Sequence, residues 1–231
     1  MDEAGRGPVL GPLVVAGVAV LDPDLPGSLG CTDSKRLSPD KRRALDRELR
    51  KASGVRIAVR RFEADELDTR RRAGETLTTI ELEAFGSIAH ELGAATVIVD
   101  AAHPSETAFA DLLRPKIPGT CSLRSEHKAD LNHPVVGAAS IIAKVARDKA
   151  VATLARRLER QVAMPVGSGY PSDPDTRAFL LAWHREFKAW PDGTRQTWAT
   201  LRELLAPRPT KLEMFDADAA ERDVRLLEAP I

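Results

Sequence analysis

The feature that most constrains the fold is an unbroken apolar run at residues 13–21, which is long enough for a strand buried on both faces. Directly before it stands Asp2-Glu3-Ala4-Gly5-Arg6-Gly7-Pro8, where two adjacent carboxylates precede a glycine-rich turn. Neighbouring side chains of a strand point to opposite faces. Asp2 and Glu3 can therefore converge on one site only where the chain twists or ends, and the turn provides such a place.

The turn itself has the composition of an anion site. Gly5 and Gly7 permit positive φ and let the backbone approach a ligand closely, because no Cβ intervenes. Successive N–H groups in such a turn form a concavity that binds anions, and Arg6 adds a planar fork that suits phosphate. Carboxylates for cations beside a cradle for anions suit metal-dependent phosphodiester chemistry. The alternative is a solvated terminus followed by an ordinary turn.

Composition sets the class of protein. The chain has 231 residues, of which 43% are hydrophobic and 29% charged, so we expect one domain with at most a small helical addition. No apolar run reaches the ~18 residues that a membrane span requires, and no signal peptide is evident. Cys31 and Cys121 are isolated, which fits a reducing compartment. We therefore expect a cytoplasmic, monomeric protein.

Charge is unevenly distributed although the net charge is zero. Residues 35–72 are rich in Lys and Arg, and the tail after Lys211 is acidic. The basic segment is either an electrostatic footprint for phosphates or a set of solvated helix faces that nearby acids balance. Those acids are Asp46, Glu48, Asp65 and Glu66.

Periodicity predicts alternating strands and helices. We expect strands at residues 13–21, 55–60, 96–100 and 120–123, and helices at 39–52, 64–72, 75–92, 105–113, 135–158, 174–190 and 194–205. Ser38 and Asp173 are predicted N-caps, each followed by proline. Residues 22–27 and 124–134 are predicted loops.

Four acids fall at the ends of these elements, namely Asp2, Glu3, Asp100 and Asp130. Grouped carboxylates repel one another unless cations compensate. Mg²⁺ is commonly held by carboxylates together with substrate phosphates, and two such ions can activate a water and stabilise a leaving oxygen. Spacing alone does not bring the four acids together.

Several motifs, in order along the chain, resemble those of ribonuclease HII. They are the opening Asp2–Pro8 motif, Asp33-Ser34-Lys35 with Leu37, Val99-Asp100, Lys128-Ala129-Asp130 and residues 138–148. The loop at residues 167–174 and Trp198-Ala199-Thr200 resemble the archaeal branch of that family. The resemblance covers about residues 2–205.

The resemblance implies an α/β, ribonuclease H-like fold, with a mixed sheet flanked by helices. The catalytic domain would span residues 1–160, a C-terminal helical substrate-binding region 161–206, and an acidic, disordered tail 207–231. It implies an endoribonuclease that cleaves RNA in RNA/DNA hybrids and incises duplex DNA at embedded ribonucleotides. The products would carry 3′-hydroxyl and 5′-phosphate ends, and the cofactor would be Mg²⁺ or Mn²⁺.

Site residues follow from the same resemblance. Asp2, Glu3, Asp100 and Asp130 match the catalytic, metal-binding carboxylates. Gly5, Arg6 and Gly7 match the turn that contacts the ribose 2′-hydroxyl, the group that distinguishes RNA from DNA. Tyr170 matches the tyrosine that stacks on the deoxyribose at the RNA–DNA junction. Further candidate phosphate contacts are Lys35, Lys128, Ser140 and Lys144.

The sequence departs from the family pattern at two places, and the first of them keeps an alternative open. The family usually has apolar residues before the Asp-Glu pair, whereas Met1 stands there in this sequence. A first strand cut short would give a hybrid-binding protein with impaired catalysis. Thr78 replaces the usual Asn. A nucleotide-binding enzyme is set aside because no Gly-x-x-x-x-Gly-Lys-Ser/Thr motif is present. His127 and His133 are expected to be solvated.

The tail carries one weaker pattern. Leu212 and Phe215, with Met214 between them, resemble a degenerate sliding-clamp peptide, although Pro209 stands where such peptides usually have Gln. The alternative is a disordered acidic tail without this function.

Overall fold

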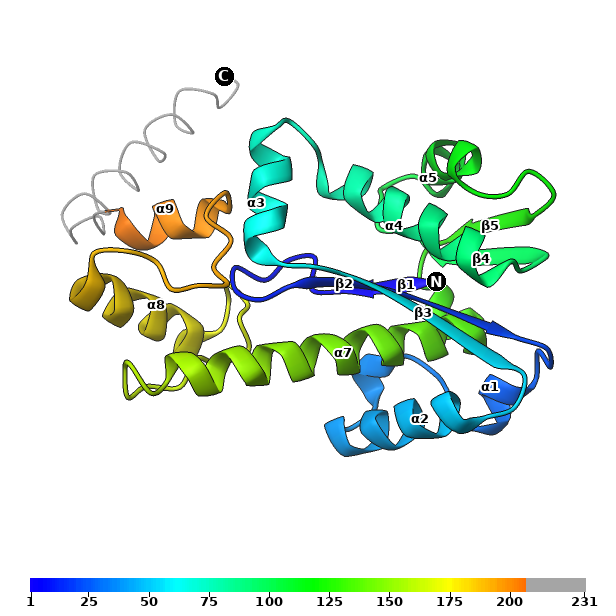
Figure 1. Cartoon of the computed structure of the whole chain (residues 1–231), viewed down its shortest axis with the longest axis horizontal. Helices are drawn as coiled ribbons and strands as arrows, with labels where there is room; N and C mark the ends of the chain where they lie inside the picture. Colours follow the sequence, from blue (N-terminus) through cyan, green and yellow to red (C-terminus); the bar gives the residue numbers. More distant parts are fainter. Residues whose placement is uncertain (207–231) are drawn as a thin grey trace, which may run out of the picture. The chain divides into compact units, whose positions relative to one another are not determined.

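The computed structural model describes residues 1–206 of the chain (Figure 1). The strands are β1 Asp2–Ala4, β2 Leu13–Val20, β3 Val55–Phe62, β4 Thr96–Asp100 and β5 Ser122–Glu126. The α-helices are α1 Leu25–Ser28, α2 Pro39–Lys51, α3 Ala64–Arg72, α4 Leu77–Leu92, α5 Glu106–Leu113, α6 Ala129–Asn132, α7 Pro134–Leu158, α8 Pro174–Phe187 and α9 Ala199–Leu205. Short 3₁₀ helices occupy Ser34–Arg36 and Arg114–Lys116.

The short strand β1 connects two sets of strands. On one side it pairs antiparallel with β2, with Asp2 opposite Ala16, and β2 pairs antiparallel with β3. On the other side the Met1 nitrogen donates to the Ile98 carbonyl at 2.6 Å, and the Met1 carbonyl accepts from Asp100 N–H at 3.1 Å. Strand β4 in turn pairs parallel with β5. The result is the mixed arrangement of strands that the sequence predicts.

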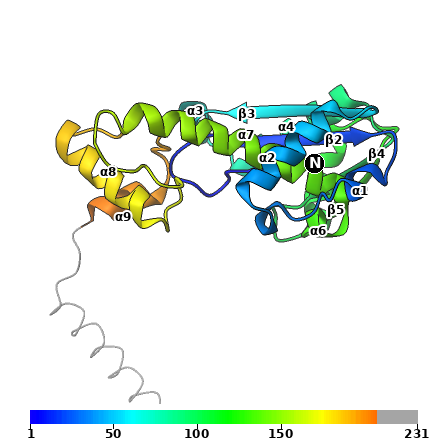
Figure 2. The same cartoon turned by 90° about the horizontal axis from the view of Figure 1, so that it is seen from below.

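The apolar run of β2 is buried on both faces, as its composition predicts. Val14 and Ala16 pack into one core with α2 and α7, while Leu13 and Val15 pack into a second core with α4. Figure 1 shows α4 on one side of the sheet and α7 on the other. Figure 2 shows α2 beside α7 on that second side. Alanines in the first turns of α7 have no exposed surface, so small side chains let this helix lie close to β2.

Most predicted elements are confirmed, and both predicted N-caps hold. The Ser38 hydroxyl accepts from Lys41 N–H, and the Asp173 carboxylate accepts from Asp175 N–H. Helix α8 ends earlier than expected because Lys188 adopts the left-handed conformation, with φ 54°. The last helix begins at Ala199 rather than 194.

Three further differences concern short elements. Helices α1 and α6 were predicted to be loop, and each contains only four residues. Strand β5 lies at Ser122–Glu126 rather than 120–123. Segments this short carry too little periodicity to separate a helical turn from a polar loop.

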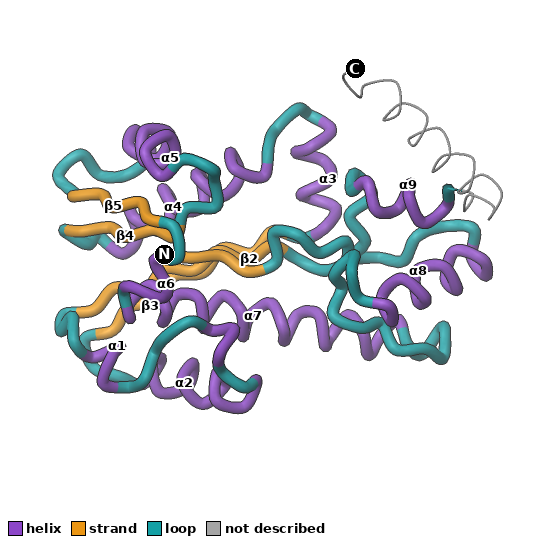
Figure 3. The backbone as a smooth tube through the Cα atoms, turned by 180° about the vertical axis from the view of Figure 1, so that it is seen from behind, coloured by secondary structure: helices purple, strands orange, loops and turns teal. Residues whose placement is uncertain are grey.

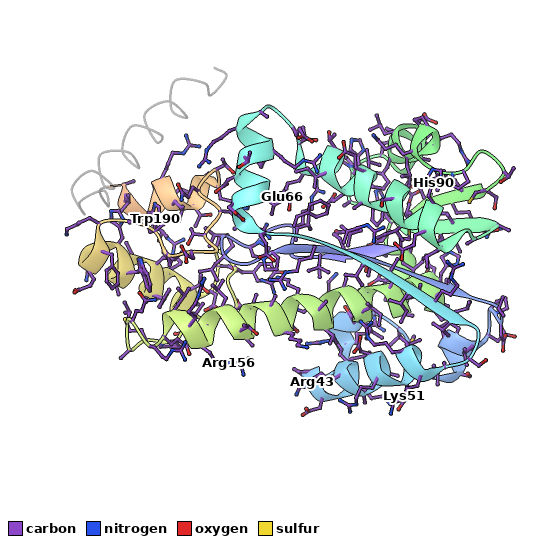
Figure 4. The ribbon with its side chains drawn as sticks, in the orientation of Figure 1. Arg43, Lys51, Glu66, His90, Arg156 and Trp190 are labelled. Carbon is purple, nitrogen blue, oxygen red and sulfur yellow. The ribbon has the colours of Figure 1, made fainter. Side chains whose placement is uncertain are left out.

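Half of the Lys and Arg side chains at residues 35–72 form ion pairs within the described part of the protein. These ion pairs include Arg43 with Asp40, Arg50 with Asp46, Arg60 with Glu91, Arg61 with Glu63, and Arg70 with Glu75 and Glu83. Figure 4 shows Arg43 and Lys51 on the side of α2 that faces away from α7. These contacts favour the interpretation as solvated helix faces over a dedicated phosphate footprint.

Contacts between residues define a first compact unit, Met1–Trp198, and a second that begins at Ala199. The predicted boundary at residue 160 stays a prediction, and the predicted acidic tail lies outside the described residues. Within residues 1–206 no helix is long and apolar enough to cross a membrane. Both cysteines are buried free thiols.

Candidate active site

Three segments that are distant in sequence bring the four predicted carboxylates into one region. Asp2 lies on β1 and is 5% exposed, and Asp130 lies in the first turn of α6 and is 6% exposed. Asp100 ends β4, and its Oδ1 accepts from the N–H of Ala129 at 2.9 Å. Figure 3 shows the start of β1, the end of β4 and α6 side by side.

The four acids form one electrostatic cluster. Burial raises the pKa of Asp2 to about 6, and the Asp100 charge adds to this rise while the Ser140 hydroxyl opposes it. Burial also raises the pKa of Glu3 well above its usual value, with Asp2, Glu81 and Asp100 contributing further. The pKa of Asp130 rises because of burial and then because of Asp100 and Asp33.

This cluster fits a hard divalent cation. Glu3 Oε2 is buried and has no hydrogen-bond partner among the described residues. Within that same part of the chain, no group of three or more His, Cys, Asp or Glu side chains is already arranged to hold a metal ion. A divalent cation takes oxygen ligands, and it would relieve both the repulsion between the carboxylates and the unpartnered oxygen.

The glycine-rich turn depends on Gly5 but not on the conformation of Gly7. Gly5 has φ +93°, and a Cβ there would lie 2.5 Å from the Pro12 carbonyl oxygen. Gly7 lies outside the left-handed region, contrary to the expectation that both glycines serve positive φ. A Cβ at Gly7 would lie 3.9 Å from the Tyr170 ring, so the turn and the tyrosine are neighbours.

Arg6 is anchored by a carboxylate that the sequence did not single out. Its guanidinium pairs with Glu81, which is fully buried on α4, and donates to Thr78 Oγ1 at 3.1 Å. Burial raises the pKa of Glu81 to about 7, and the Arg6 charge opposes this rise. The only signal in the sequence was one carboxylate within the apolar stripe of a helix. Arg6 stays partly exposed and is available to a ligand.

Two of the candidate phosphate contacts, Lys35 and Lys128, lie close to Asp130, and the other two, Ser140 and Lys144, lie on α7. Lys35 is exposed and lowers the pKa of Asp130, and Lys128 immediately precedes α6 with φ 56°. Ser140 is buried, and its hydroxyl lies 3.0 Å from that of Ser34. Lys144 donates to Asp148 at 2.8 Å.

The two histidines contact glutamates outside the carboxylate cluster. His133 lies 2.9 Å from Glu126, and His127 lies 3.3 Å from Glu106. His127 is exposed as expected, while His133 is partly buried.

Comparison with known proteins identifies the family. Residues 1–201 match the family model described as Ribonuclease HII. A ribonuclease HII of Methanoregula boonei is 39% identical over 208 residues, which cover 90% of this chain and 94% of that protein.

Two solved structures share the fold. Ribonuclease HII in its PCNA complex from Archaeoglobus fulgidus is 38% identical, with a TM-score of 0.78 over 90% of this chain and 96% of that one. Ribonuclease H2 of Pyrococcus horikoshii is 35% identical, with a TM-score of 0.76 over 88% and 94%. These likenesses confirm the ribonuclease H-like architecture.

Proposed function

Since the chain belongs to the ribonuclease HII family, it is an endoribonuclease of the ribonuclease H type that acts on RNA/DNA hybrids, and we propose that its four clustered carboxylates carry the hydrolysis. One observation supports this proposal above the others. Asp2 and Glu3 lie on β1, and the turn at residues 5–7 directly follows that strand and neighbours Tyr170. Groups suited to cations and to a nucleotide sugar thus share one surface.

The family depends on divalent metal ions, and we propose Mg²⁺ or Mn²⁺ for this chain. Asp2, Glu3, Asp100 and Asp130 would hold them. When bound, such ions supply an activated water and stabilise the leaving oxygen of a phosphodiester. The protein keeps these carboxylates in place through the β1–β4 hydrogen bonds and through the Ala129 N–H that fixes Asp100.

Substrate selection follows from the turn and the tyrosine. Backbone groups of residues 5–7, with no Cβ at Gly5, can reach a ribose 2′-hydroxyl. Arg6 would hold the adjoining phosphate, and the flat ring of Tyr170 would pack against a sugar without a 2′-hydroxyl. We therefore propose incision of duplex DNA at single embedded ribonucleotides, with 3′-hydroxyl and 5′-phosphate products. Lys35 and Lys128 would contact phosphates near Asp130.

The alternative of a hybrid-binding protein with impaired catalysis is not favoured. Asp2–Ala4 forms a strand paired with β2, and Met1 is hydrogen-bonded to β4 on the other side. The geometry of Asp2 is therefore fixed from both sides rather than frayed.

A cleavage assay tests the proposal. The substrate is a labelled DNA duplex with one ribonucleotide, incubated with Mg²⁺ or Mn²⁺, and the variants are Asp130→Asn and Asp111→Asn. Asp111 is an exposed acid on α5 and serves as the matched control. We expect cleavage by the wild type and Asp111→Asn but not by Asp130→Asn. Equal cleavage by Asp130→Asn would refute its assignment, and binding without cleavage by the wild type would restore the alternative.

A sliding clamp is a further candidate partner. The Archaeoglobus fulgidus relative forms a complex with PCNA. We propose that this chain binds a clamp through Leu212 and Phe215, which lie outside the described residues. A clamp pull-down with the full chain and with a chain ending at residue 208 tests this, and equal recovery would end the idea.

A further inference from the structure

Two arginines outside the predicted site are among the largest fully buried side chains in the protein. Arg147 on α7 is 2% exposed, and Arg195, between α8 and α9, is 0% exposed. Within residues 1–206 Arg195 forms no ion pair, although the charge of the buried Asp68 acts to raise its pKa, and Arg147 has only the partly exposed Asp148 at 3.7 Å. Burying a charge is costly unless it is paired and hydrogen-bonded, so other contacts must offset the cost of burying these two guanidinium groups.

The hydrogen bonds of Arg195 all go to the segment that contains the substrate-reading turn. Its Nη2 donates to the Gly5 carbonyl at 2.6 Å, its Nη1 to the Arg6 carbonyl at 3.1 Å, and its Nε to the Gly11 carbonyl at 2.9 Å. The rigid fork of one guanidinium thus joins the first two residues of the turn to Gly11, just before β2. The Trp198 ring covers the guanidinium at 4.9 Å.

Arg147 contacts the turn and the tyrosine loop together. Its Nη2 donates to the Ser168 carbonyl at 3.0 Å, and its guanidinium lies 4.9 Å from the centre of the Tyr170 ring. A Cβ on Gly5 would come within 2.8 Å of Arg147 Cδ, so the Arg147 side chain lies directly against the turn. The Gly169 carbonyl also accepts from the N–H groups that follow Pro8, at 2.9 and 3.2 Å. The two loops therefore meet on this pair of arginines.

We propose that Arg147 and Arg195 are positioning residues that hold the turn at residues 5–7 and Tyr170 together as one rigid surface that recognises the RNA–DNA junction. A phosphate of the bound duplex balances the charge of the two arginines. The proposal rests on the proposed function. Like charges at close range in a low-dielectric interior repel, and the nucleic acid brings phosphates to the outer side of this turn. Part of the binding energy of the substrate would then come from its attraction to two buried arginines that it does not contact.

Lysine and glutamine variants separate the two parts of the proposal. Arg147→Lys and Arg195→Lys keep the charge but lose the fork, and Arg195→Gln loses both. Because a misplacement of about 1 Å can lower a rate ~100-fold, we expect both lysine variants to lose roughly 10- to 100-fold in kcat/KM on the single-ribonucleotide duplex. The loss on a long RNA/DNA hybrid should be several times smaller, because many registers are available there. A merely structural role would lower kcat/KM equally for both substrates.

Binding without divalent metal tests the charge. With EDTA present, the affinity for the ribonucleotide-containing duplex is measured against salt concentration. A positive charge that neutralises bound phosphate contributes up to about 1 to the slope of log affinity against log salt, and the buried Arg195 would act through this charge rather than through a contact. We expect the slope to decrease for Arg195→Gln and not for Arg195→Lys. An unchanged slope for a folded Arg195→Gln protein would overturn the phosphate part of the proposal.

Two controls keep the result interpretable. Arg56 also caps two backbone carbonyls, those of Leu92 and Glu91 at 2.8 and 2.6 Å, and Arg56→Lys should leave the ratio between the two substrates unchanged. If the Arg195 variants do not fold, a double-mutant cycle of Arg147→Lys with Tyr170→Ala decides. If the losses in kcat/KM of the two single variants do not add up in the double variant, Arg147 acts by positioning the Tyr170 ring, and additive losses refute this role. A wild type that neither prefers the ribonucleotide-containing duplex nor cleaves it would instead refute the proposed function.

Discussion

Replacing Asp2 with asparagine should stabilise the metal-free protein while abolishing its activity. Burial raises the pKa of Asp2 from 3.8 to about 6. In the folded protein the carboxyl therefore keeps its proton up to about pH 6, whereas the unfolded chain releases it near 3.8. Folding stability thus decreases as the pH rises between these values, and the full deficit remains above pH 6. At ~1.4 kcal/mol per pKa unit, the deficit is about 3 kcal/mol.

The asparagine side chain removes this charge but keeps an acceptor for the Glu3 N–H, which now donates to Asp2 Oδ1 at 2.7 Å. We expect a gain of about 2–3 kcal/mol at pH 8 in EDTA, or roughly 5–10 °C in Tm for a chain of this length. At pH 4 the gain should shrink to less than ~1 kcal/mol, because the carboxyl is neutral in the folded state and only partly ionised in the unfolded chain. Added Mg²⁺ should narrow the difference, since ions that bind only the folded wild type stabilise it.

Urea unfolding monitored by circular dichroism measures these changes at both pH values, with and without Mg²⁺. Asp111→Asn, which replaces an exposed acid, should change stability by less than ~0.5 kcal/mol. An Asp2→Asn protein that is less stable than the wild type at pH 8 in EDTA would refute the reasoning. It would mean that the hydrogen bonds of the carboxylate outweigh the cost of burying its charge.

Four further substitutions test the parts of the site separately. Gly5→Ala should lower the free energy of unfolding by about 1–3 kcal/mol because of its positive φ, whereas Gly7→Ala should leave it nearly unchanged in the same urea experiment. Glu81→Gln should raise KM, because Arg6 loses its charged anchor, and should shift the acid limb of the pH–rate profile to lower pH, because Glu81 raises the pKa of Glu3. Lys128→Gly should stabilise the fold by up to ~1 kcal/mol, because glycine adopts φ 56° freely, while KM for the duplex rises.

Local signals in the sequence predicted the parts of the fold that local physics controls. The run in β2 carries no polar residue, so burial on both faces was the only arrangement that fitted it. Ser38 and Asp173 each precede a proline and cap a helix as expected. Asp100 ends an apolar strand, and its place at the site follows from where ligands bind in α/β sheets.

The contacts that the sequence could not predict join residues far apart along the chain. Glu81 anchors Arg6 across 75 positions, and Arg195 fixes the Gly5 carbonyl across 190. Asp68 likewise accepts from the N–H groups of Gln196 and Thr197, across 128 and 129 positions. Periodicity describes one element at a time, so a charged residue inside an apolar pattern reveals that it needs a partner but not which one.

Buried charges of opposite sign occur on the two sides of the turn, and a ligand of the site can compensate each of them. On the side of β1, Asp2 and its neighbouring carboxylates carry excess negative charge, and burial raises their pKa values. On the other side, Arg147 of α7 pairs only with the partly exposed Asp148 within residues 1–206, and the buried Asp68 offsets part of the charge of Arg195 without forming an ion pair with it. Among the described residues no ion pair joins the two groups. Cations would relieve the first excess and substrate phosphate the second, so metal and duplex should each stabilise the protein, and each should favour the other's binding. A site already neutral before its ligands arrived would gain less from both.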